Sequence, residues 1–259
     1  MKVGRFLFSY FKHLVTARNT KGFGVHSPFV YQFIRFVLYE KHYFYAFTGI
    51  EALRKELKRD RRIIGIKDFG TGADRFESVG SIVKRSAKPA KYGKLLFRIA
   101  HYFKSRQVLE LGTSIGLTTS YLATSSSGIQ CVTFEGSPEI ACVAAENFRT
   151  LGLDNITLKI GNINQTLQPC VDSLERLDLL FFDANHTSTA VLAYFETCLS
   201  KVHKNTVFIL DDIHWSKDME SAWETVKKHS RVTATIDLFE LGIVFFNTDL
   251  NKKHYKMRY

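Results

Sequence analysis

The sequence predicts an α/β protein built on a doubly wound, mostly parallel sheet, and three observations lead to this class. Short apolar runs alternate with amphipathic stretches from residue 107 onward. These runs are continuously apolar, which is typical of parallel strands buried on both faces. Near the end of the chain, two further runs are separated by only three residues, a connection that permits an antiparallel hairpin but no crossover.

Five runs are expected to be parallel strands and the last two a hairpin, which makes a seven-stranded, Rossmann-like sheet. The parallel strands are predicted at 107–111, 129–135, 156–160, 177–183 and 206–212, and the hairpin strands at 232–239 and 243–247. Segments of helical length lie between them at 115–126, 138–151, 164–174 and 187–201. Repeated strand–helix units place helices on both faces of such a sheet.

The first part of the chain has a different composition and predicts a separate, mainly helical module. Residues 1–100 carry 21 Lys and Arg against 7 Asp and Glu, and 14 of the 35 aromatic residues fall within residues 1–47. Helical spacing is found at 5–16, at 50–60 and at 27–46, the last opening with Ser27 as N-cap and Pro28 as first helical residue. We predict a basic, aromatic N-terminal module over residues 1–88, acting as a lid over the substrate, and a second domain over residues 89–259.

The overall composition excludes several classes of protein. The chain has 259 residues, a formal net charge of +11 and 45% hydrophobic residues, values that rule out a disordered, collagen-like or disulfide-stapled chain. No apolar run approaches the roughly 18–20 residues needed to cross a bilayer. The four cysteines lie far apart with no C-x-x-C pair, so they predict buried thiols in a reducing compartment. We therefore expect a cytoplasmic protein.

Residues 108–117, V-L-E-L-G-T-S-I-G-L, predict a strand that runs into a glycine loop and then a helix. Gly112 and Gly116 would let the backbone approach a ligand, and the helix N-terminus offers free N–H groups. Glu110 can accept hydrogen bonds from a cationic or hydroxylic ligand, and Glu135, 25 residues later, ends the next strand where a carboxylate would hold a ribose diol. The loop lacks a third glycine for a pyrophosphate. It therefore favours a phosphate-free, positively charged nucleoside such as S-adenosylmethionine.

Five segments in this order resemble the successive motifs of class I S-adenosylmethionine-dependent methyltransferases: VLELGTSIGLTTSYLA, VTFEGSPEIA, GNINQTL, LLFFDANH and FILDDIHW. The resemblance covers roughly residues 90–247 and is strongest to the small-molecule O-methyltransferases, the group that includes catechol O-methyltransferase. It implies a cofactor site in which the methionine part is surrounded by Glu110, Gly112, Thr113, Ser114 and Gly116, the ribose lies at Glu135 and Gly136, the adenine lies at Asn162 and Ile163, and Asp183 also contacts the cofactor.

The same resemblance implies direct displacement of the methyl group by an acceptor oxygen. Asp183 ends the fourth strand, at the edge where such sheets bind ligands, and His186 stands where the family often has a lysine base. Histidine can accept a proton at neutral pH. In metal-dependent members the positions of Asp183, Asp211 and Asp212 hold magnesium, which leaves Mg²⁺ as an open expectation. Neighbouring strand residues point to opposite faces, so Asp211 and Asp212 can share one ion only if the strand has ended.

Several alternatives stay open. A second glycine turn, Asp68–Arg75, is not followed by an apolar strand ending in an acid, so we predict a turn of the N-terminal module there. Rival functions are a nucleic-acid-directed methyltransferase, a nucleotide-binding oxidoreductase and a non-catalytic binding module. The D/N-P-P-Y/F run of base N-methyltransferases is absent after the fourth strand. The basic module could contact nucleic acid or an anionic membrane surface, and the acceptor and oligomeric state are not readable from the sequence.

Overall fold

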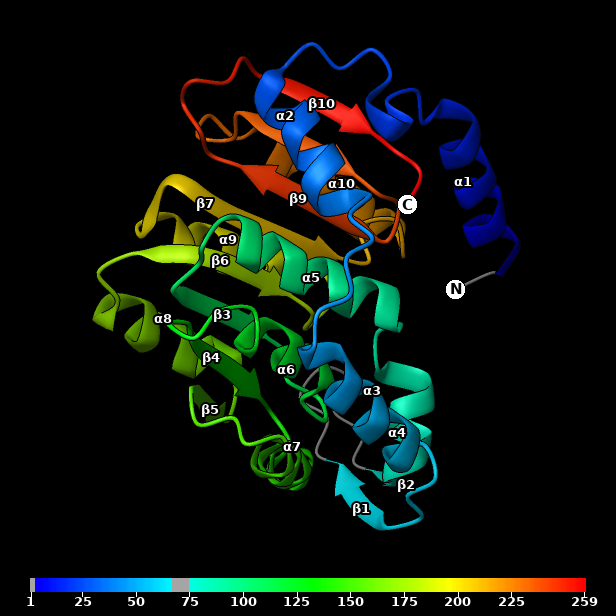
Figure 1. Ribbon diagram of the computed structural model, residues 1–259, viewed down its shortest axis with the longest axis vertical. Coiled ribbons are helices and arrows are strands. Elements are labelled where there is room, and N and C mark those ends of the chain that lie inside the picture. Colours follow the sequence, from blue (N-terminus) through cyan, green and yellow to red (C-terminus); the bar gives the residue numbers. More distant parts are fainter. Residues whose placement is uncertain (1–2, 67–74) are drawn as a thin grey trace. The chain divides into compact units, whose positions relative to one another are not determined.

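The computed structural model describes residues 3–66 and 75–259. Within these residues the protein has an α/β fold with an eight-stranded, largely parallel mixed sheet, a separate two-stranded hairpin and helices at the N-terminus (Figure 1). The predicted fold class is therefore confirmed. The glycine turn Asp68–Arg75 lies outside the described residues except for Arg75, which begins a strand.

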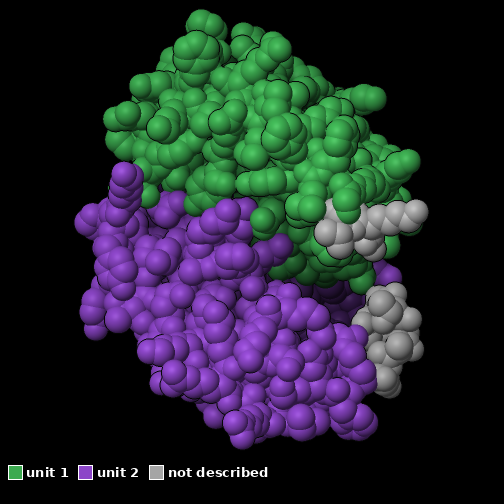
Figure 2. Space-filling model, turned by 90° about the vertical axis from the view of Figure 1, so that its right-hand side faces the viewer, with its two compact units in different colours: residues 1–40, 174–259 green, residues 41–173 purple. Residues whose placement is uncertain are grey.

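The chain forms two compact units (Figure 2). One unit comprises residues 1–40 and 174–259, and the other comprises residues 41–173. The expected division into residues 1–88 and 89–259 stays a prediction. The limits of the two units fall at other positions, and each unit is described by itself below.

The 41–173 unit contains three parallel strands in the order β3 (Gln107–Leu111), β4 (Gln130–Glu135) and β5 (Ile156–Ile160). Their register pairs Leu111 with Phe134 and Glu135 with Ile160, so the carboxyl ends of the three strands lie along one edge. The helices that accompany these strands are α5 (Ala90–Tyr102), α6 (Leu117–Ala123), α7 (Pro138–Thr150) and α8 (Ile163–Ser173). The alternation predicted from the apolar runs is thus confirmed, with boundaries shifted by at most a few residues.

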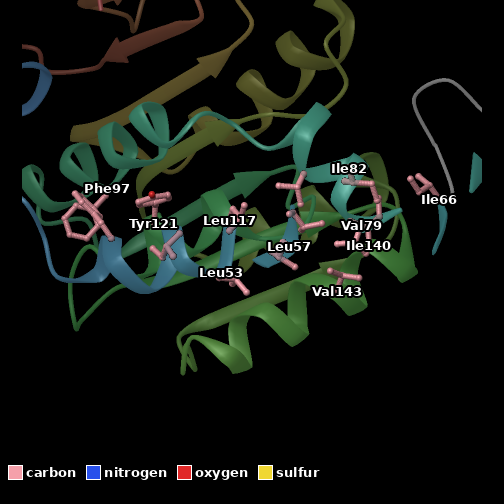
Figure 3. Packing of buried hydrophobic residues seen from close by; sticks show 14 residues of the cluster. Leu53, Leu57, Ile66, Val79, Ile82, Phe97, Leu117, Tyr121, Ile140 and Val143 are labelled. Atoms are coloured by element: carbon pink, nitrogen blue, oxygen red, sulfur yellow. The ribbon is translucent and has the colours of Figure 1, made fainter. Parts of the chain in front are cut away.

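A small helical layer completes the same unit. It consists of α3 (Ala46–Leu57), the antiparallel hairpin of β1 (Ile63–Ile66) and β2 (Arg75–Ser78), and α4 (Val79–Ser86). Leu53 and Leu57 from α3 and Ile82 from α4 join a buried cluster with Leu117 of α6 and Val143 of α7 (Figure 3). Burial of this apolar surface against the helices of the sheet stabilises the layer.

The other unit contains five strands in the order β10-β8-β9-β7-β6. Their bounds are β6 (Leu177–Phe182), β7 (Val202–Asp211), β8 (Ala234–Asp237), β9 (Leu241–Phe245) and β10 (Lys253–Lys256). The predicted hairpin is confirmed as the antiparallel pair of β8 and β9, whereas β10, parallel to β8, is an eighth strand that the sequence did not indicate. Only Tyr255 of β10 is buried, and its lysines are typical of a protected edge strand.

The N-terminal part of this unit packs on its C-terminal strands. It runs through α1 (Val3–Thr16), the 3-10 turn η1 (Thr20–Gly22), α2 (Pro28–Phe33) and the π-helical turn η2 (Ile34–Leu38). The Ser27 side chain accepts a hydrogen bond from the Val30 N–H, which confirms the predicted cap. Phe29 and Phe33 meet the Phe245 ring of β9 edge to face, with centroids 5.3 and 5.2 Å away. The helix predicted over 27–46 therefore ends earlier, at η2.

Two further helices cover this unit, α9 (Ser188–Leu199) and α10 (Lys217–Lys228). Each begins at a hydroxyl side chain that accepts a backbone N–H, Thr187 for α9 and Ser216 for α10. Among the helices formed by residues 3–66 and 75–259, none combines the length and the apolar character that a bilayer-crossing segment needs.

Candidate active site

The loop after β3 has a backbone that suits close approach to a ligand. Gly112 and Gly116 have φ angles of 103° and 81°, and Ser114 between them also lies in the left-handed region, at 49°. The N–H groups of Gly112 and Thr113 donate to the Phe134 carbonyl at 3.1 and 2.9 Å, which fixes the loop to the end of β4. The structure therefore brings the predicted loop and the end of the second strand together.

Glu135 is held against this loop by backbone donors. Its Oε2 accepts the Ser114 N–H at 2.8 Å, and its Oε1 accepts the Ser137 N–H at 3.0 Å. Burial raises the pKa of the Glu135 carboxyl, while the N–H groups of Ser137, Ser114 and Gly136 oppose that rise. A carboxylate placed in this way at a strand end can accept from a vicinal diol with its remaining lone pairs.

Glu110 lies deeper than a strand-end acid, with no exposed surface. Its Oε2 accepts hydrogen bonds from the Thr119 hydroxyl and, at 2.7 Å, from the Thr133 hydroxyl. Its Oε1 is buried without a hydrogen-bond partner in the described part of the chain. Burial raises the pKa of this carboxyl to about 8, so it carries a proton at neutral pH when no cation is beside it.

This raised pKa predicts a dependence of stability on pH that the Glu110→Gln variant lacks. A carboxyl whose folded pKa exceeds its unfolded value stabilises the fold below the unfolded pKa, and this contribution is lost as pH rises through the folded pKa. Between about pH 4.5 and pH 8, we expect the wild type to lose up to about 1.4 kcal/mol per pH unit relative to Glu110→Gln. Urea unfolding at pH 5, 6.5 and 8 without cofactor measures this difference.

The matched control is Glu175→Gln, because Glu175 is an exposed glutamate. Its difference from wild type should stay nearly constant over the same pH values. A constant difference for Glu110→Gln as well would contradict a neutral Glu110.

Gly116 is also required by packing. A Cβ at this position would lie 2.4 Å from the Phe148 ring and 3.3 Å from the Cβ of Ala144, both on α7. Both loop glycines have the positive φ that favours glycine, and the close contact with α7 is a second reason for a glycine at Gly116. Their contact with a ligand stays a prediction.

Asn162 and Ile163 follow β5, at the same edge as the glycine loop. The Asn162 Oδ1 accepts the Asn164 N–H at 3.0 Å, and Ile163 opens α8 with 7% of its surface exposed. Gly161 before them has a φ of 132°, which turns the chain away from the strand. These positions suit the border of a flat, apolar group, and the assignment to adenine stays a prediction.

The predicted catalytic side chains lie in the other unit, after β6 and β7. His186 Nε2 is 3.8 Å from Asp183 Oδ1, and Asp211, the last residue of β7, is only 1% exposed. One ligand atom from each of these three residues lies within 4.8 Å of the others. Asp212 is outside this cluster as the described residues form it, and its φ of 54° shows that the strand has ended at Asp211.

This donor set fits a divalent cation. Asp183 and Asp211 supply carboxylate oxygens, which Mg²⁺ prefers, whereas an imidazole ligand from His186 would favour Mn²⁺, Fe²⁺ or Zn²⁺. The sequence grouped Asp183 with Asp211 and Asp212 but did not foresee His186 as a member, because it assigned that side chain to proton transfer. The D-x-x-H spacing of Asp183 and His186 was the available signal.

The strands, the glycine loop and the acids at the strand ends define the fold of class I methyltransferases. Residues 109–213 match a family model described as "Methyltransferase domain", and the resemblance drawn from the motifs of the chain is confirmed. The chain is 31% identical over 137 residues to a catechol O-methyltransferase of Mycobacterium tuberculosis (strain ATCC 25618 / H37Rv), a match that covers 50% of this chain and 58% of that relative's length.

Two solved structures of similar fold are O-methyltransferases by name. TomG from Streptomyces achromogenes, involved in tomaymycin synthesis and crystallised with S-adenosylmethionine, aligns with a TM-score of 0.58 and 18% identity over 83% of this chain and 95% of its own. An O-methyltransferase from Bacillus cereus in complex with S-adenosylhomocysteine aligns with a TM-score of 0.57 and 22% identity. This alignment covers 83% of this chain and 96% of that one. These similarities establish the shared fold.

Proposed function

We propose that this protein is an S-adenosylmethionine-dependent O-methyltransferase that acts on a small acceptor of the catechol type. The observation that carries the proposal is the Glu135 carboxylate bonded to the Ser114 N–H of the glycine loop, where it can accept from the ribose hydroxyls of a nucleoside. The matched methyltransferase domain and the catechol O-methyltransferase relative support the same function. They favour it over a nucleotide-binding oxidoreductase.

In the proposed complex, each part of the cofactor meets residues suited to its chemistry. The sulfonium carries a positive charge, so the methionine part would lie along Gly112, Thr113 and Ser114, with the Glu110 carboxyl beneath the loop. The ribose hydroxyls would donate to Glu135, beside Gly136, and the adenine would lie against Asn162 and Ile163. Asn162 can accept from the adenine amino group through its amide oxygen.

The acceptor oxygen must be aligned with the methyl group and must lose its proton. We assign proton acceptance to His186 and its orientation to Asp183, 3.8 Å from it. Asp183 and Asp211 would hold a divalent cation, with Asp212 retained from the sequence as a further proposed ligand. Such a cation, when bound, lowers the pKa of a coordinated hydroxyl.

The decisive experiment is calorimetric titration of the protein with S-adenosylmethionine and with S-adenosylhomocysteine, each with and without Mg²⁺. Transfer of a radiolabelled methyl group to 1,2-dihydroxybenzene then tests the acceptor class. Binding of both nucleosides and transfer to the diol are expected. Preference for a nicotinamide cofactor, or binding without any single-turnover transfer, would overturn the proposal.

The His186→Ala variant should transfer methyl groups about 10²–10⁴-fold more slowly than wild type, the usual contribution of a general base. Single-turnover transfer measures this loss. The control is His203→Ala, because His203 lies near the start of β7 and pairs with Asp178. An unaltered rate in His186→Ala would eliminate this base.

For the basic N-terminal part we propose contact with an anionic membrane surface. In α1, Leu7, Phe8, Phe11 and Val15 are between 58% and 71% exposed and, at 100° per residue, lie on one stripe. The opposite side, at His13, is buried. Residues 1–22 contain five Lys and Arg and no acid, which complements anionic lipid headgroups.

Sedimentation with vesicles of phosphatidylserine and phosphatidylcholine tests this contact. Wild type should bind, and Phe8→Ser/Phe11→Ser should bind about 10-fold more weakly, since each exposed Phe contributes apolar area. Pure phosphatidylcholine is the charge control. Equal binding by the double variant would contradict the proposal, and steeply salt-dependent binding to RNA in place of vesicles would favour the nucleic-acid alternative.

We also propose a cytoplasmic location. All four cysteines are free, and three of them are buried. Free buried thiols suit a reducing compartment. Cell fractionation followed by immunodetection tests the location.

A further inference from the structure

A second cluster of titratable side chains lies in the unit of residues 1–40 and 174–259, and it shares no residue with the candidate active site. His13 of α1 places Nδ1 3.4 Å from Oδ1 of Asp237, which ends β8. His214, in the loop after β7, places Nε2 2.9 Å from Oδ2 of the same carboxylate. One ligand atom from each residue lies within 4.8 Å of the others. Two imidazoles thus face one carboxylate.

The outward nitrogens of both imidazoles face oxygen acceptors. His13 Nε2 lies 2.9 Å from the Met257 carbonyl, and His214 Nδ1 lies 3.5 Å from Glu220 Oε1. A carbonyl only accepts hydrogen bonds, so the His13 proton must be on Nε2. Metal-binding histidines almost always donate their second ring N–H to a carbonyl or carboxylate, as His13 does here.

The inward nitrogen of His13 therefore presents a lone pair to the Asp237 carboxylate. His13 is 2% exposed, and its Nδ1 has no hydrogen-bond partner among the residues that the structure describes. A lone pair that faces a carboxylate oxygen at 3.4 Å inside the protein is unfavourable, and a cation between the two atoms would relieve it, although Asp237 Oδ1 also accepts the Phe239 N–H at 2.9 Å.

We propose that His13 Nδ1, His214 Nε2 and the Asp237 carboxylate bind a zinc ion. Imidazole and carboxylate ligands suit Zn²⁺, and three protein ligands leave a fourth tetrahedral position for water. On binding, the proton on the neutral His214 ring moves from Nε2 to Nδ1. The Nδ1–H group then faces Glu220 Oε1, which can accept a hydrogen bond from it. The Lys256 ammonium, 4.0 Å from Asp237, is about one-third exposed and can turn to solvent.

A zinc ion at this site would link parts of the chain that are distant in sequence. His13 lies on α1, His214 follows β7, and Asp237 ends β8, so one ion would join the N-terminal helix to the C-terminal hairpin. Asp237 and His13 are separated by 224 residues, and a link that closes so long a loop restricts the unfolded chain strongly.

The test is calorimetric titration of the full chain with zinc chloride in an Asp183→Ala/Asp211→Asn background. These two substitutions remove the carboxylates of the candidate active site, so that zinc cannot bind to them. The background protein should bind one equivalent of Zn²⁺, and adding His13→Gln or His214→Gln should weaken that binding at least 100-fold. Gln can still donate to the Met257 carbonyl, so the His13 variant keeps its outer hydrogen bond. His203→Gln, which alters another histidine–aspartate pair at 2.8 Å, should bind as the background does.

A spectroscopic measurement and a stability measurement separate ligation from a purely structural role. Co²⁺ should give the intense visible absorption of a tetrahedral site in the background protein and in His203→Gln but not in His13→Gln. Zn²⁺ should raise the melting temperature of the same two proteins only. If His13→Gln does not fold, Asp237→Asn replaces it. Retention of full zinc affinity and of the cobalt spectrum in a folded variant of the cluster would overturn the proposal.

Discussion

Gly112→Val should bind S-adenosylmethionine at least about 100-fold more weakly than the wild type. Gly112 has a φ of 103°, where a β-branched residue costs of order 1–3 kcal/mol. Relief of that strain would shift the loop whose N–H groups bond to the Phe134 carbonyl, and it would place two methyl groups where the cofactor backbone is proposed to lie. A loss of about 2.7 kcal/mol corresponds to the 100-fold change.

The effect of backbone strain alone must be distinguished from the loss of the proposed cofactor site. Gly152 has a φ of 66° and no atom within 4 Å of an added Cβ, so Gly152→Val introduces a comparable backbone strain at an open position. Titration calorimetry should find wild-type affinity in Gly152→Val and little or none in Gly112→Val. Thermal melting verifies that both variants are folded. Undiminished affinity in a folded Gly112→Val protein would refute the assignment of the loop.

The features that could be predicted from the sequence are those that neighbouring residues determine. Continuous apolar runs indicated the parallel strands, and the short link before Ile243 indicated the hairpin of β8 and β9. Ser27 and Pro28 marked a helix start because capping depends on three or four consecutive residues. The loop at Gly112 was visible for the same reason, since its strand, turn and helix are contiguous in the chain.

The features that could not be predicted depend on residues far apart in the chain. Glu110 seemed to be a strand-end acid, but the hydroxyls of Thr119 and Thr133 enclose it and its environment raises its pKa. Gly116 is required by the Phe148 ring of another helix. No local pattern reveals that the neutral nitrogen of a buried histidine faces a carboxylate from the opposite end of the sequence.

The same reasoning distinguishes the two consecutive aspartates after β7, which the sequence treated as one ligand pair. Alternation would point them to opposite faces only within a strand, and the structure places the end of β7 between them. Asp211 is buried in the cluster with Asp183 and His186, while Asp212 adopts a left-handed conformation outside that cluster of the described residues. The carboxylate of Asp211 is thus the one that lies with the proposed base.

Asp211→Asn should therefore slow methyl transfer to 1,2-dihydroxybenzene by about two to four orders of magnitude. The amide preserves the volume of the side chain but removes the negative charge that would hold a cation and stabilise a protonated His186. Cofactor affinity should change little, because the proposed ribose and methionine contacts lie on other residues. Single-turnover transfer and calorimetric titration measure the two quantities separately.

Asp249→Asn is the matched control, because Asp249 is exposed and pairs only with Lys204 in the described structure. It should transfer at the wild-type rate. A chelator should reproduce the Asp211→Asn loss if the carboxylate acts through a cation, whereas activity that survives chelation would assign Asp211 to orienting His186 alone. A wild-type rate in Asp211→Asn would contradict a role of this carboxylate in the chemistry. Asn fits the left-handed backbone of Asp212 without strain, so Asp212→Asn tests the carboxylate alone. An equal loss of rate in that variant would retain Asp212 as a ligand.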